Sequence, residues 1–272
     1  MRDETMAYLQ INGLNIWSER RGDGAPLLFI SGTGGDLRRK PGVMDGPLPK
    51  HFDTVVYDQR GLGQSDKPDG PYSMADYADD AAAVLDELDW ARAHVVGVSF
   101  GGMVAQNLAV RHPGRIERLV LCCTSPGGAG GSSWPLHTLA GLAPEARARH
   151  MIPISDRRRD GAWAAAHPEQ YEMLVRMAAD DPWADEPRRQ LGAALQLQAR
   201  AGHDVWDRLP EIDVPTLICA GRHDDLAAPA SQEAMASRIR GSRLRWYEGG
   251  HMFLLEDRAA FSDIIAFLGE SG

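Results

Sequence analysis

The stretch that decides the fold runs from Val95 to Gly102 and reads VVGVSFGG. It places Ser99 between an apolar run, residues 93–98, and a segment with helical composition, residues 100–111. A strand that turns sharply into a helix at a serine between glycines is typical of a nucleophile elbow. A serine hydroxyl is a poor nucleophile without a base, so this interpretation requires a histidine and an acid elsewhere in the chain.

The candidates for base and acid both follow predicted strands. His251 lies in the glycine loop YEGGHMFLLED, and Asp224 lies in CAGRHDDLAAP after the predicted strand 215–221. In a parallel sheet, functional groups gather at the carboxyl ends of the strands. We therefore expect Ser99 to be the nucleophile, His251 the base and Asp224 the acid that orients it. Asp225 is the alternative acid, and a solvated loop position is the alternative for His251.

Strands and helices alternate along most of the chain. Asn12-Gly13 is a strong hairpin signal between the first two predicted strands. The alternation predicts an α/β fold, a mainly parallel sheet of about eight strands with helices on both faces. The predicted strands are 6–11, 14–20, 27–30, 52–58, 93–98, 116–123, 215–221 and 244–248, and the predicted helices are 71–88, 100–111, 229–239 and 258–268.

The alternation is interrupted between residues 125 and 206. This stretch lacks strand-like patterning and predicts a helical lid inserted into a core of residues 1–124 and 207–272. Its Trp134, Trp163 and Met177 are candidates to line an apolar substrate pocket, with packing of the lid onto the sheet as the alternative.

Polar residues of the insertion allow two further expectations. His203 and Asp204 could point into the pocket, although we expect a surface or hinge pair. Arg157, Arg158 and Arg159 are typical of a solvated face. One arginine of the insertion could bind a substrate carboxylate, and the sequence does not identify which one.

The composition excludes several classes of function. The net charge of −9 argues against nucleic-acid binding, which needs a basic face. Residues 93–110 carry no formal charge, but polar residues and three glycines within them argue against a membrane span.

The cysteines indicate the compartment. Cys122, Cys123 and Cys219 lie in apolar runs without metal-ligand spacing. We expect buried free thiols and a cytoplasmic protein that binds no metal. The N-terminal residues MRDETMAYLQ show no apolar signal core, and the sequence does not indicate an oligomeric state.

Several motifs together resemble the α/β-hydrolase superfamily over nearly the full length of the chain. They are GVSFG, YDQRGLGQSDKP (57–68), the Gly-x-x-Asp-x-x-x-x-Pro of residues 221–229, and GGHMFLLED before a terminal helix. The order Ser-Asp-His along the chain is the order of that superfamily. The elbow continues as GGMVAQ (101–106), which resembles bacterial 3-oxoadipate enol-lactonases and related carboxylesterases.

The resemblance implies an oxyanion hole made of two backbone N–H groups. One is that of Phe100, at the start of a helix. The other comes from the loop Ser31-Gly32-Thr33-Gly34-Gly35, where most family members carry His-Gly. By position we expect Thr33 to supply it, with Gly34 as the alternative. Asp58 and Arg60, in YDQRG, resemble a structural loop without a catalytic role.

The resemblance also implies a reaction. A serine hydrolase of this kind cleaves a small carboxylic ester or lactone through an acyl-enzyme and needs no cofactor. A carbon–carbon bond hydrolase of aromatic catabolism keeps the same triad and remains an alternative. So does a ligand-binding receptor on the same fold with little turnover, because fold alone does not determine function.

Overall fold

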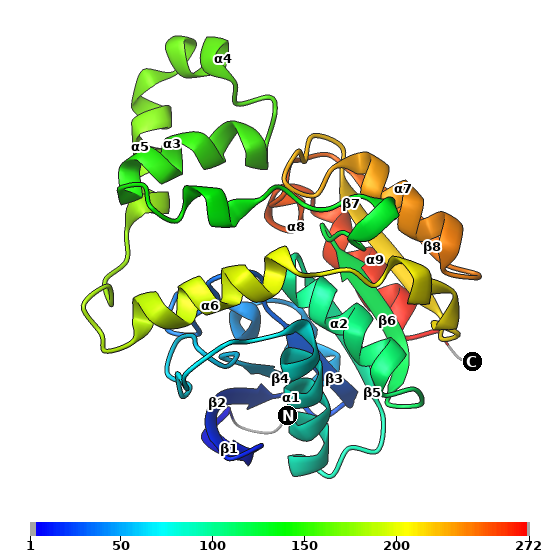
Figure 1. Cartoon of the computed structure of the whole chain (residues 1–272). Coiled ribbons are helices and arrows are strands. Elements are labelled where there is room, and N and C mark those ends of the chain that lie inside the picture. Colours follow the sequence, from blue (N-terminus) through cyan, green and yellow to red (C-terminus); the bar gives the residue numbers. More distant parts are fainter. Residues whose placement is uncertain (1–3, 271–272) are drawn as a thin grey trace.

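The computed structural model describes residues 4–270, and its central feature is an eight-stranded sheet (Figure 1). The strand order is β1-β2-β4-β3-β5-β6-β7-β8. The α/β class and the number of strands agree with the sequence prediction. The strands are β1 Thr5–Ile11, β2 Leu14–Arg21, β3 Ala25–Ile30, β4 Phe52–Tyr57, β5 Ala93–Val98, β6 Ile116–Cys122, β7 Thr216–Gly221 and β8 Arg243–Tyr247.

Only one edge of the sheet is antiparallel. Strands β1 and β2 form the predicted hairpin, with Asn12 and Gly13 in the left-handed region at φ 49° and 76°. Strand β2 also pairs antiparallel with β4, whereas β4, β3, β5, β6, β7 and β8 pair in parallel. The carboxyl ends of the six parallel strands therefore all point in the same direction. Residues that follow these strands can meet in one site, as the sequence analysis expects.

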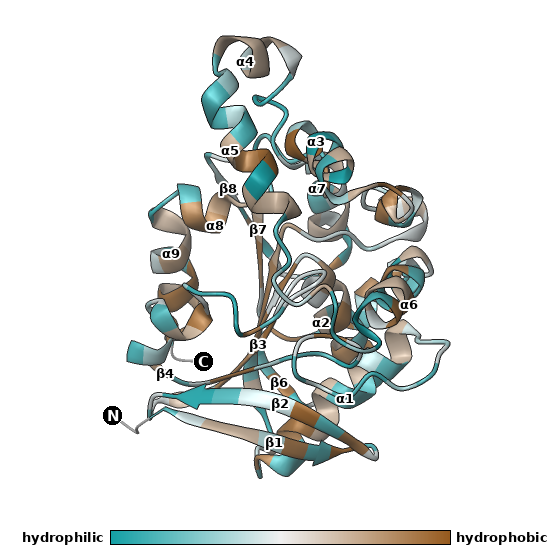
Figure 2. Ribbon diagram, turned by 90° about the vertical axis from the view of Figure 1, so that its left-hand side faces the viewer, coloured by the Kyte–Doolittle hydropathy of each residue, from teal (hydrophilic) through white to brown (hydrophobic). Residues whose placement is uncertain are grey.

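Two apolar layers cover the faces of the sheet (Figure 2). Successive strand residues point to opposite faces, so Val95 packs in one layer and Val96 in the other. Burying a side chain of this size contributes about 1.5–3 kcal/mol. One layer contains α1 Met74–Glu87, α2 Phe100–Arg111 and α7 Pro229–Arg238; the other contains α8 Phe253–Glu256 and α9 Ala259–Leu268.

Residues 125–206, which lie between β6 and β7, are here called the insertion. Its helices are α3 Pro144–Ser155, α4 Gly161–Ala166, α5 Pro168–Ala179 and α6 Arg189–Ala201. Helices α3 and α5 share a small apolar cluster of Ala148, Ile152 and Val175, and together with α4 they project from the core (Figure 1).

Helix α6 instead lies directly against the core. Its buried face has the i, i+3, i+4 spacing of an amphipathic helix. Gly192 permits close contact, because a Cβ at that position would lie 1.9 Å from the backbone oxygen of Gly61. The buried residues of the helix are Gly192, Leu195, Gln196, Ala199 and Arg200.

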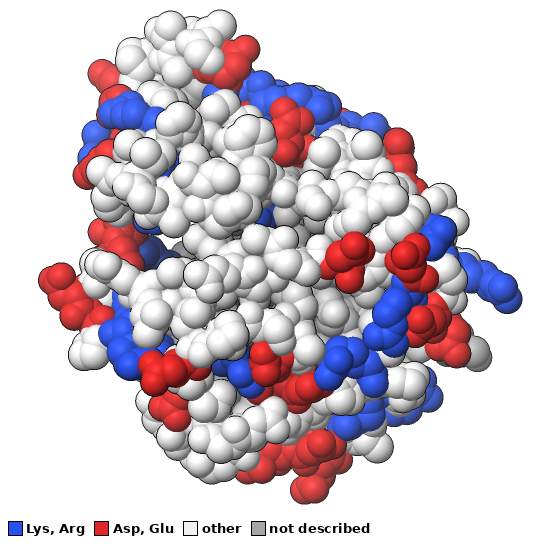
Figure 3. Space-filling model, in the orientation of Figure 1, with Lys and Arg blue, Asp and Glu red and all other residues white. Residues whose placement is uncertain are grey.

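The charged side chains on the surface are mixed in sign. Lys and Arg alternate with Asp and Glu around the face shown in Figure 3, so this face carries no continuous basic patch. None of the helices within residues 4–270 is long and apolar enough to cross a membrane. Cys122, Cys123 and Cys219 are free and buried, as expected.

Candidate active site

Ser99 occupies the sharp turn between β5 and α2. Its φ and ψ of 55° and −115° lie outside the regions that non-glycine residues ordinarily adopt. A conformation of this kind costs about 1–3 kcal/mol and persists only where the surroundings fix it. Here the N–H of Ser99 donates to the Cys122 oxygen at 2.8 Å, which ties the turn to the end of β6. The sequence-predicted elbow is therefore present.

The glycines on either side of Ser99 permit this turn. A Cβ at Gly97 would lie 2.4 Å from the Gly101 oxygen, and a Cβ at Gly101 would lie 2.0 Å from the Ile30 oxygen. Both neighbouring atoms belong to the backbone and cannot move aside cheaply. Gly-x-Ser-x-Gly is thus required by steric contact at this position.

Ser99, His251 and Asp224 form one chain of hydrogen bonds. The Nε2 atom of His251 lies 2.9 Å from Ser99 Oγ, and its Nδ1 atom lies 2.7 Å from Asp224 Oδ2. A carboxylate only accepts, so Nδ1 carries the proton and Nε2 is free to accept from the serine hydroxyl. The structure therefore brings together the three residues that the sequence singled out.

Asp224 is held as an orienting acid would be. It is 1% exposed, and its Oδ1 accepts from the N–H groups of Leu226 and Ala227 at 2.8 and 2.9 Å. Asp225, the alternative acid, instead pairs with Arg157 at the surface. The geometry favours Asp224.

The end of α3 contacts the loops of both the acid and the base. The N–H of His251 donates to the Ser155 oxygen at 2.6 Å. The N–H of Asp225 donates to the Ile154 oxygen at 3.1 Å. The insertion thus fixes the backbone on both sides of the hydrogen-bonded chain, which the sequence did not reveal.

The two backbone N–H groups predicted to form an oxyanion hole belong to the start of α2 and to the loop after β3. Phe100 is the first residue of α2, where an N–H has no acceptor within the helix and the helix dipole favours negative charge. The loop after β3 lies against the serine, since a Cβ at Gly32 would be 3.4 Å from Ser99 Cβ. The N–H of Gly34 already donates to Gln196 Oε1 at 2.9 Å, which favours Thr33 as the second donor.

Gln196 was not identified from the sequence. It is fully buried on α6, and its Oε1 accepts a hydrogen bond from the N–H of Gly34 in the loop after β3. A polar residue within the apolar spacing Gly192, Leu195, Ala199 was the available signal. A polar residue at such a position is predicted to be buried, but its hydrogen-bond partner cannot be predicted, because Gly34 lies 162 residues earlier in the chain.

Asp58 and Arg60 each make buried polar contacts within the core. Asp58 accepts from the N–H groups of Leu37 and Gln64, each at 2.8 Å, and burial raises its pKa to about 6. Arg60 pairs with the buried Asp80.

The expectation of a surface position is wrong for His203. It is 6% exposed, and its Nε2 donates to the Ser125 oxygen at 3.0 Å while its Nδ1 accepts from Asn107 at 3.3 Å. Burial lowers its pKa to about 4, so it is neutral at pH 7. Asp204 is exposed.

The candidate pocket residues of the insertion lie in different places. The Trp134 side chain is partly exposed at the junction with the core. The backbone N–H of Trp134 donates to the Leu226 oxygen at 2.8 Å. Trp163 on α4 stacks on His167, which follows that helix, and Met177 on α5 is 66% exposed. Their contact with a substrate stays a prediction.

Comparison with known proteins places this geometry in a family. Residues 25–258 match the family described as alpha/beta hydrolase fold. A poly(3-hydroxyalkanoate) depolymerase of Ectopseudomonas oleovorans is 30% identical, over 88% of this chain and 82% of that protein. A 2-hydroxymuconate semialdehyde hydrolase of Pseudomonas putida is 30% identical, over 92% and 89%. The crystal structure of the enol-lactonase from Burkholderia xenovorans LB400 superposes with a TM-score of 0.78 at 30% identity, covering 97% of this chain and 100% of that one.

Proposed function

We propose that this chain, which belongs to the alpha/beta hydrolase fold family, is a cytoplasmic serine hydrolase that cleaves a small carboxylic ester or lactone. The observation that carries the proposal is the unbroken hydrogen-bonded chain from Ser99 through His251 to Asp224. Such a chain activates a hydroxyl that would otherwise be a weak nucleophile.

In the first half of the reaction, Ser99 Oγ attacks the carbonyl carbon of the substrate. His251 Nε2 takes the hydroxyl proton, while Asp224 holds the ring and stabilises the imidazolium that forms. The N–H groups of Phe100 and Thr33 donate to the oxyanion. Collapse of the tetrahedral intermediate breaks the bond to the alcohol oxygen, which receives the proton from His251, and leaves an acyl-enzyme.

In the second half, water attacks the acyl-enzyme. His251 takes a proton from the water, the same two N–H groups hold the second oxyanion, and the proton returns to Ser99 Oγ as the acid leaves. Besides the substrate and water, every group that acts in this cycle belongs to the chain, so no cofactor is needed. Residues 125–206 serve as the lid over the site.

A carbon–carbon bond hydrolase is the second candidate. The 30% identity to the 2-hydroxymuconate semialdehyde hydrolase of Pseudomonas putida favours it. The enol-lactonase of known structure is equally similar in sequence, and the triad geometry is compatible with both reactions. Substrates of each class must therefore be compared directly.

The experiment that tests the proposal is intact-mass measurement after treatment with a fluorophosphonate probe. We expect one adduct on the wild-type protein and none on Ser99→Ala. Turnover of p-nitrophenyl esters, small lactones and a carbon–carbon substrate then separates the two reactions. A folded wild-type protein that binds these compounds without an adduct or turnover would contradict the proposal and support a ligand-binding receptor.

A further inference from the structure

The loop after β3 makes a tight turn beside Ser99. The N–H of Gly35 donates to the Gly32 oxygen at 3.3 Å, which closes a turn of four residues. Its central residues are Thr33 and Gly34, and the φ of Gly34, 71°, is the positive value that a type II turn requires at its second central residue. A Cβ at Gly32 would lie 3.4 Å from that of Ser99. The proposed oxyanion donor Thr33 therefore lies in a turn whose first residue packs on the serine.

Asp36 directly follows this turn, and two arginines hold its buried carboxylate. Its side chain is 0% exposed. Its Oδ2 accepts from Arg38 Nη2 at 2.8 Å and from Arg189 Nη1 at 2.9 Å. Burial acts to raise the pKa of Asp36, but the hydrogen bonds from Arg38 and Arg189 outweigh it, and the net effect lowers the pKa. The position of this carboxylate thus depends on both arginines.

Arg189 joins the loop to the insertion. It is the first residue of α6, and its Nε and Nη2 donate to the two carboxylate oxygens of Asp181, each at 2.7 Å. One guanidinium therefore bridges Asp36 of the core and Asp181 of the segment between α5 and α6. A cation in the first turn of a helix is opposed by the helix dipole. The two carboxylates stabilise Arg189 at this otherwise unfavourable position.

An indole ring and a third carboxylate surround the same ion pairs. The guanidinium carbons of Arg38 and Arg189 lie 4.1 and 5.7 Å from the centre of the Trp183 ring, within the range of a cation–π contact. Arg38 also pairs with Glu186. The Arg189 side chain is consequently only 13% exposed. We call this group the Asp36 cluster; it consists of Asp36, Arg38, Asp181, Trp183, Glu186 and Arg189.

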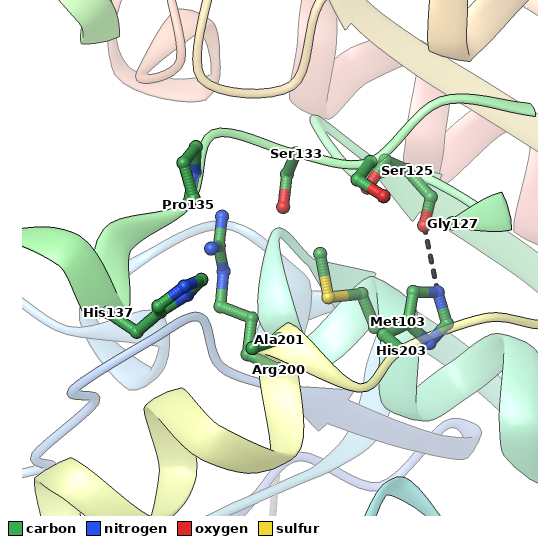
Figure 4. A pocket seen from close by; sticks show the side chains of 10 residues that line it. Met103, Ser125, Gly127, Ser133, Pro135, His137, Arg200, Ala201 and His203 are labelled. Atoms are coloured by element: carbon green, nitrogen blue, oxygen red, sulfur yellow. Dashed lines mark hydrogen bonds between the residues drawn. The ribbon is translucent and has the colours of Figure 1, made fainter.

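The opposite end of α6 is anchored within the insertion. Figure 4 shows this end beside a cavity of about 240 Å³, with the Arg200 side chain extended towards Pro135. Arg200 Nη1 donates to the Trp134 oxygen at 2.7 Å. Between the two ends, Gln196 Oε1 accepts from the N–H of Gly34 at 2.9 Å. Helix α6 thus contacts the loop after β3 at its first residue and again about two helical turns later.

We propose that Arg189 is a positioning residue that acts through Asp36 to fix the turn from which the Thr33 N–H donates to the oxyanion. The inference rests on the proposed function for the reaction at Ser99. Because the oxyanion forms only as the reaction proceeds, Arg189 affects the transition state and not the binding of the substrate. The rate of the hydrolase then depends on the docking of the insertion onto the core.

The first test compares Arg189→Gln with Arg188→Gln on p-nitrophenyl butyrate. Arg188 is the matched control, because it lies beside Arg189 and pairs with Asp69 outside the Asp36 cluster. We expect Arg189→Gln to lower kcat by about 10- to 100-fold, since a misplacement of about 1 Å can cost 100-fold, with little change in KM. Arg188→Gln should match wild type.

The value of kcat in this comparison is expressed per Ser99 that takes the fluorophosphonate adduct. Loss of folded protein therefore does not lower it. Equal kcat in the two variants, or a rise in KM without a fall in kcat for Arg189→Gln, would overturn the proposal.

A double-variant cycle tests whether Arg189 acts through Asp36. The variant that combines Asp36→Asn with Arg189→Gln should be no slower than the slower single variant, because both changes break the same contact. Losses that multiply would show that Arg189 acts by another route. Arg189→Lys keeps a charge beside Asp36 and should recover part of the lost kcat, which tests the pair even if Asp36→Asn does not fold. No recovery would count against the pair.

Hydrogen exchange measured by mass spectrometry follows the loop without any need for activity. A peptide of residues 31–38 should exchange faster in Arg189→Gln than in wild type or Arg188→Gln, whereas the hairpin of residues 5–21 should exchange equally in all three. If wild type hydrolyses no ester and this difference remains, the hydrolase fails and control of the loop by Arg189 stands. If esters are hydrolysed and neither kcat nor exchange separates Arg189→Gln from Arg188→Gln, the role of Arg189 fails and the hydrolase stands.

Discussion

The side-chain oxygen of Gln196 accepts a hydrogen bond from the N–H of Gly34 at 2.9 Å, across 162 residues of sequence. Gly34 belongs to the loop that carries the proposed oxyanion donor Thr33, and Gln196 belongs to α6 of the insertion. The insertion therefore contacts, through Gln196, the loop that carries the proposed oxyanion donor.

Replacement of Gln196 by leucine should impair catalysis more than binding. We expect kcat to fall about tenfold, less than the 100- to 1,000-fold that follows removal of an oxyanion donor itself, because the loop is loosened and not lost. KM should change little. Gln198→Leu, at an exposed position on the same helix, is the matched control. Equal kinetics for the two variants would show that the contact does not position the loop.

Asp224 and Asp225 should differ sharply in their effect on the rate. Asp224→Asn leaves the geometry but removes the acceptor that fixes the tautomer of His251, and we expect kcat to fall by about 10⁴. Asp225→Asn removes a surface ion pair and should leave kcat close to that of wild type. Steady-state kinetics on one activated ester measure both variants, and similar losses in the two would contradict the assignment of the acid.

The backbone of Ser99 should store measurable strain. Glycine adopts φ 55° without the steric cost that any side chain incurs. Ser99→Gly should therefore have a free energy of unfolding about 1 kcal/mol higher than Ser99→Ala, after allowance for the greater unfolded-state entropy of glycine. Urea denaturation of the two inactive variants tests this. A less stable glycine variant would show that the turn is unstrained.

His203 should make the protein less stable in mild acid. Its pKa falls from 6.5 in the unfolded chain to about 4 in the folded one, so below pH 6.5 the unfolded state binds the proton first. The contribution of His203 to the free energy of unfolding is fully present above pH 6.5. It falls by about 3 kcal/mol as the pH is lowered towards 4.

Asp58 acts in the opposite direction over part of the same range. Its raised pKa, about 6, makes its contribution to stability greatest below pH 3.8 and lost as the pH rises through 6. The contribution of His203 is therefore the difference between wild type and His203→Gln, measured by denaturation at several pH values. Parallel curves for the two proteins would contradict it.

Gly192→Ala should move α6 away from the core. Its Cβ would lie 1.9 Å from the Gly61 backbone oxygen, which cannot yield without moving the loop. We expect lower kcat because Gln196 would lose its reach to Gly34. Gly161→Ala, at the start of α4 with no atom within 4 Å of the new Cβ, is the control and should keep wild-type kinetics. Unchanged activity in Gly192→Ala would show that the close contact is dispensable.

The sequence predicted the sheet, the sharp turn at Ser99 and the loops that bring Asp224 and His251 to it, because each of these depends on local signals. Alternating apolar residues define strands, and glycines mark the turns that a strand–helix transition needs. Both the hairpin at Asn12-Gly13 and the flanking glycines of Ser99 are of this kind.

What the sequence did not predict depends on contacts between distant segments. Gln196 and Arg200 lie four residues apart on α6, yet the partners that give them meaning come from residues 34 and 134. His203 carries no local mark of burial, because its partners Asn107 and Ser125 lie about 80 to 100 residues earlier. Only the packing of the insertion on the core reveals these roles.

Backbone hydrogen bonds join the end of α3 to the loops of Asp225 and His251. They limit which segments of this protein can be exchanged with those of its relatives. A chimaera that exchanged the whole of residues 125–206 would keep these hydrogen bonds only if the new insertion placed two backbone carbonyl groups where those of Ile154 and Ser155 lie. Crossover points at residues 160 and 180 would exchange only α4 and α5 and keep those bonds. Sequence changes between residues 160 and 180, whether in evolution or in a mutant library, therefore leave the hydrogen bonds to the loops of Asp225 and His251 in place.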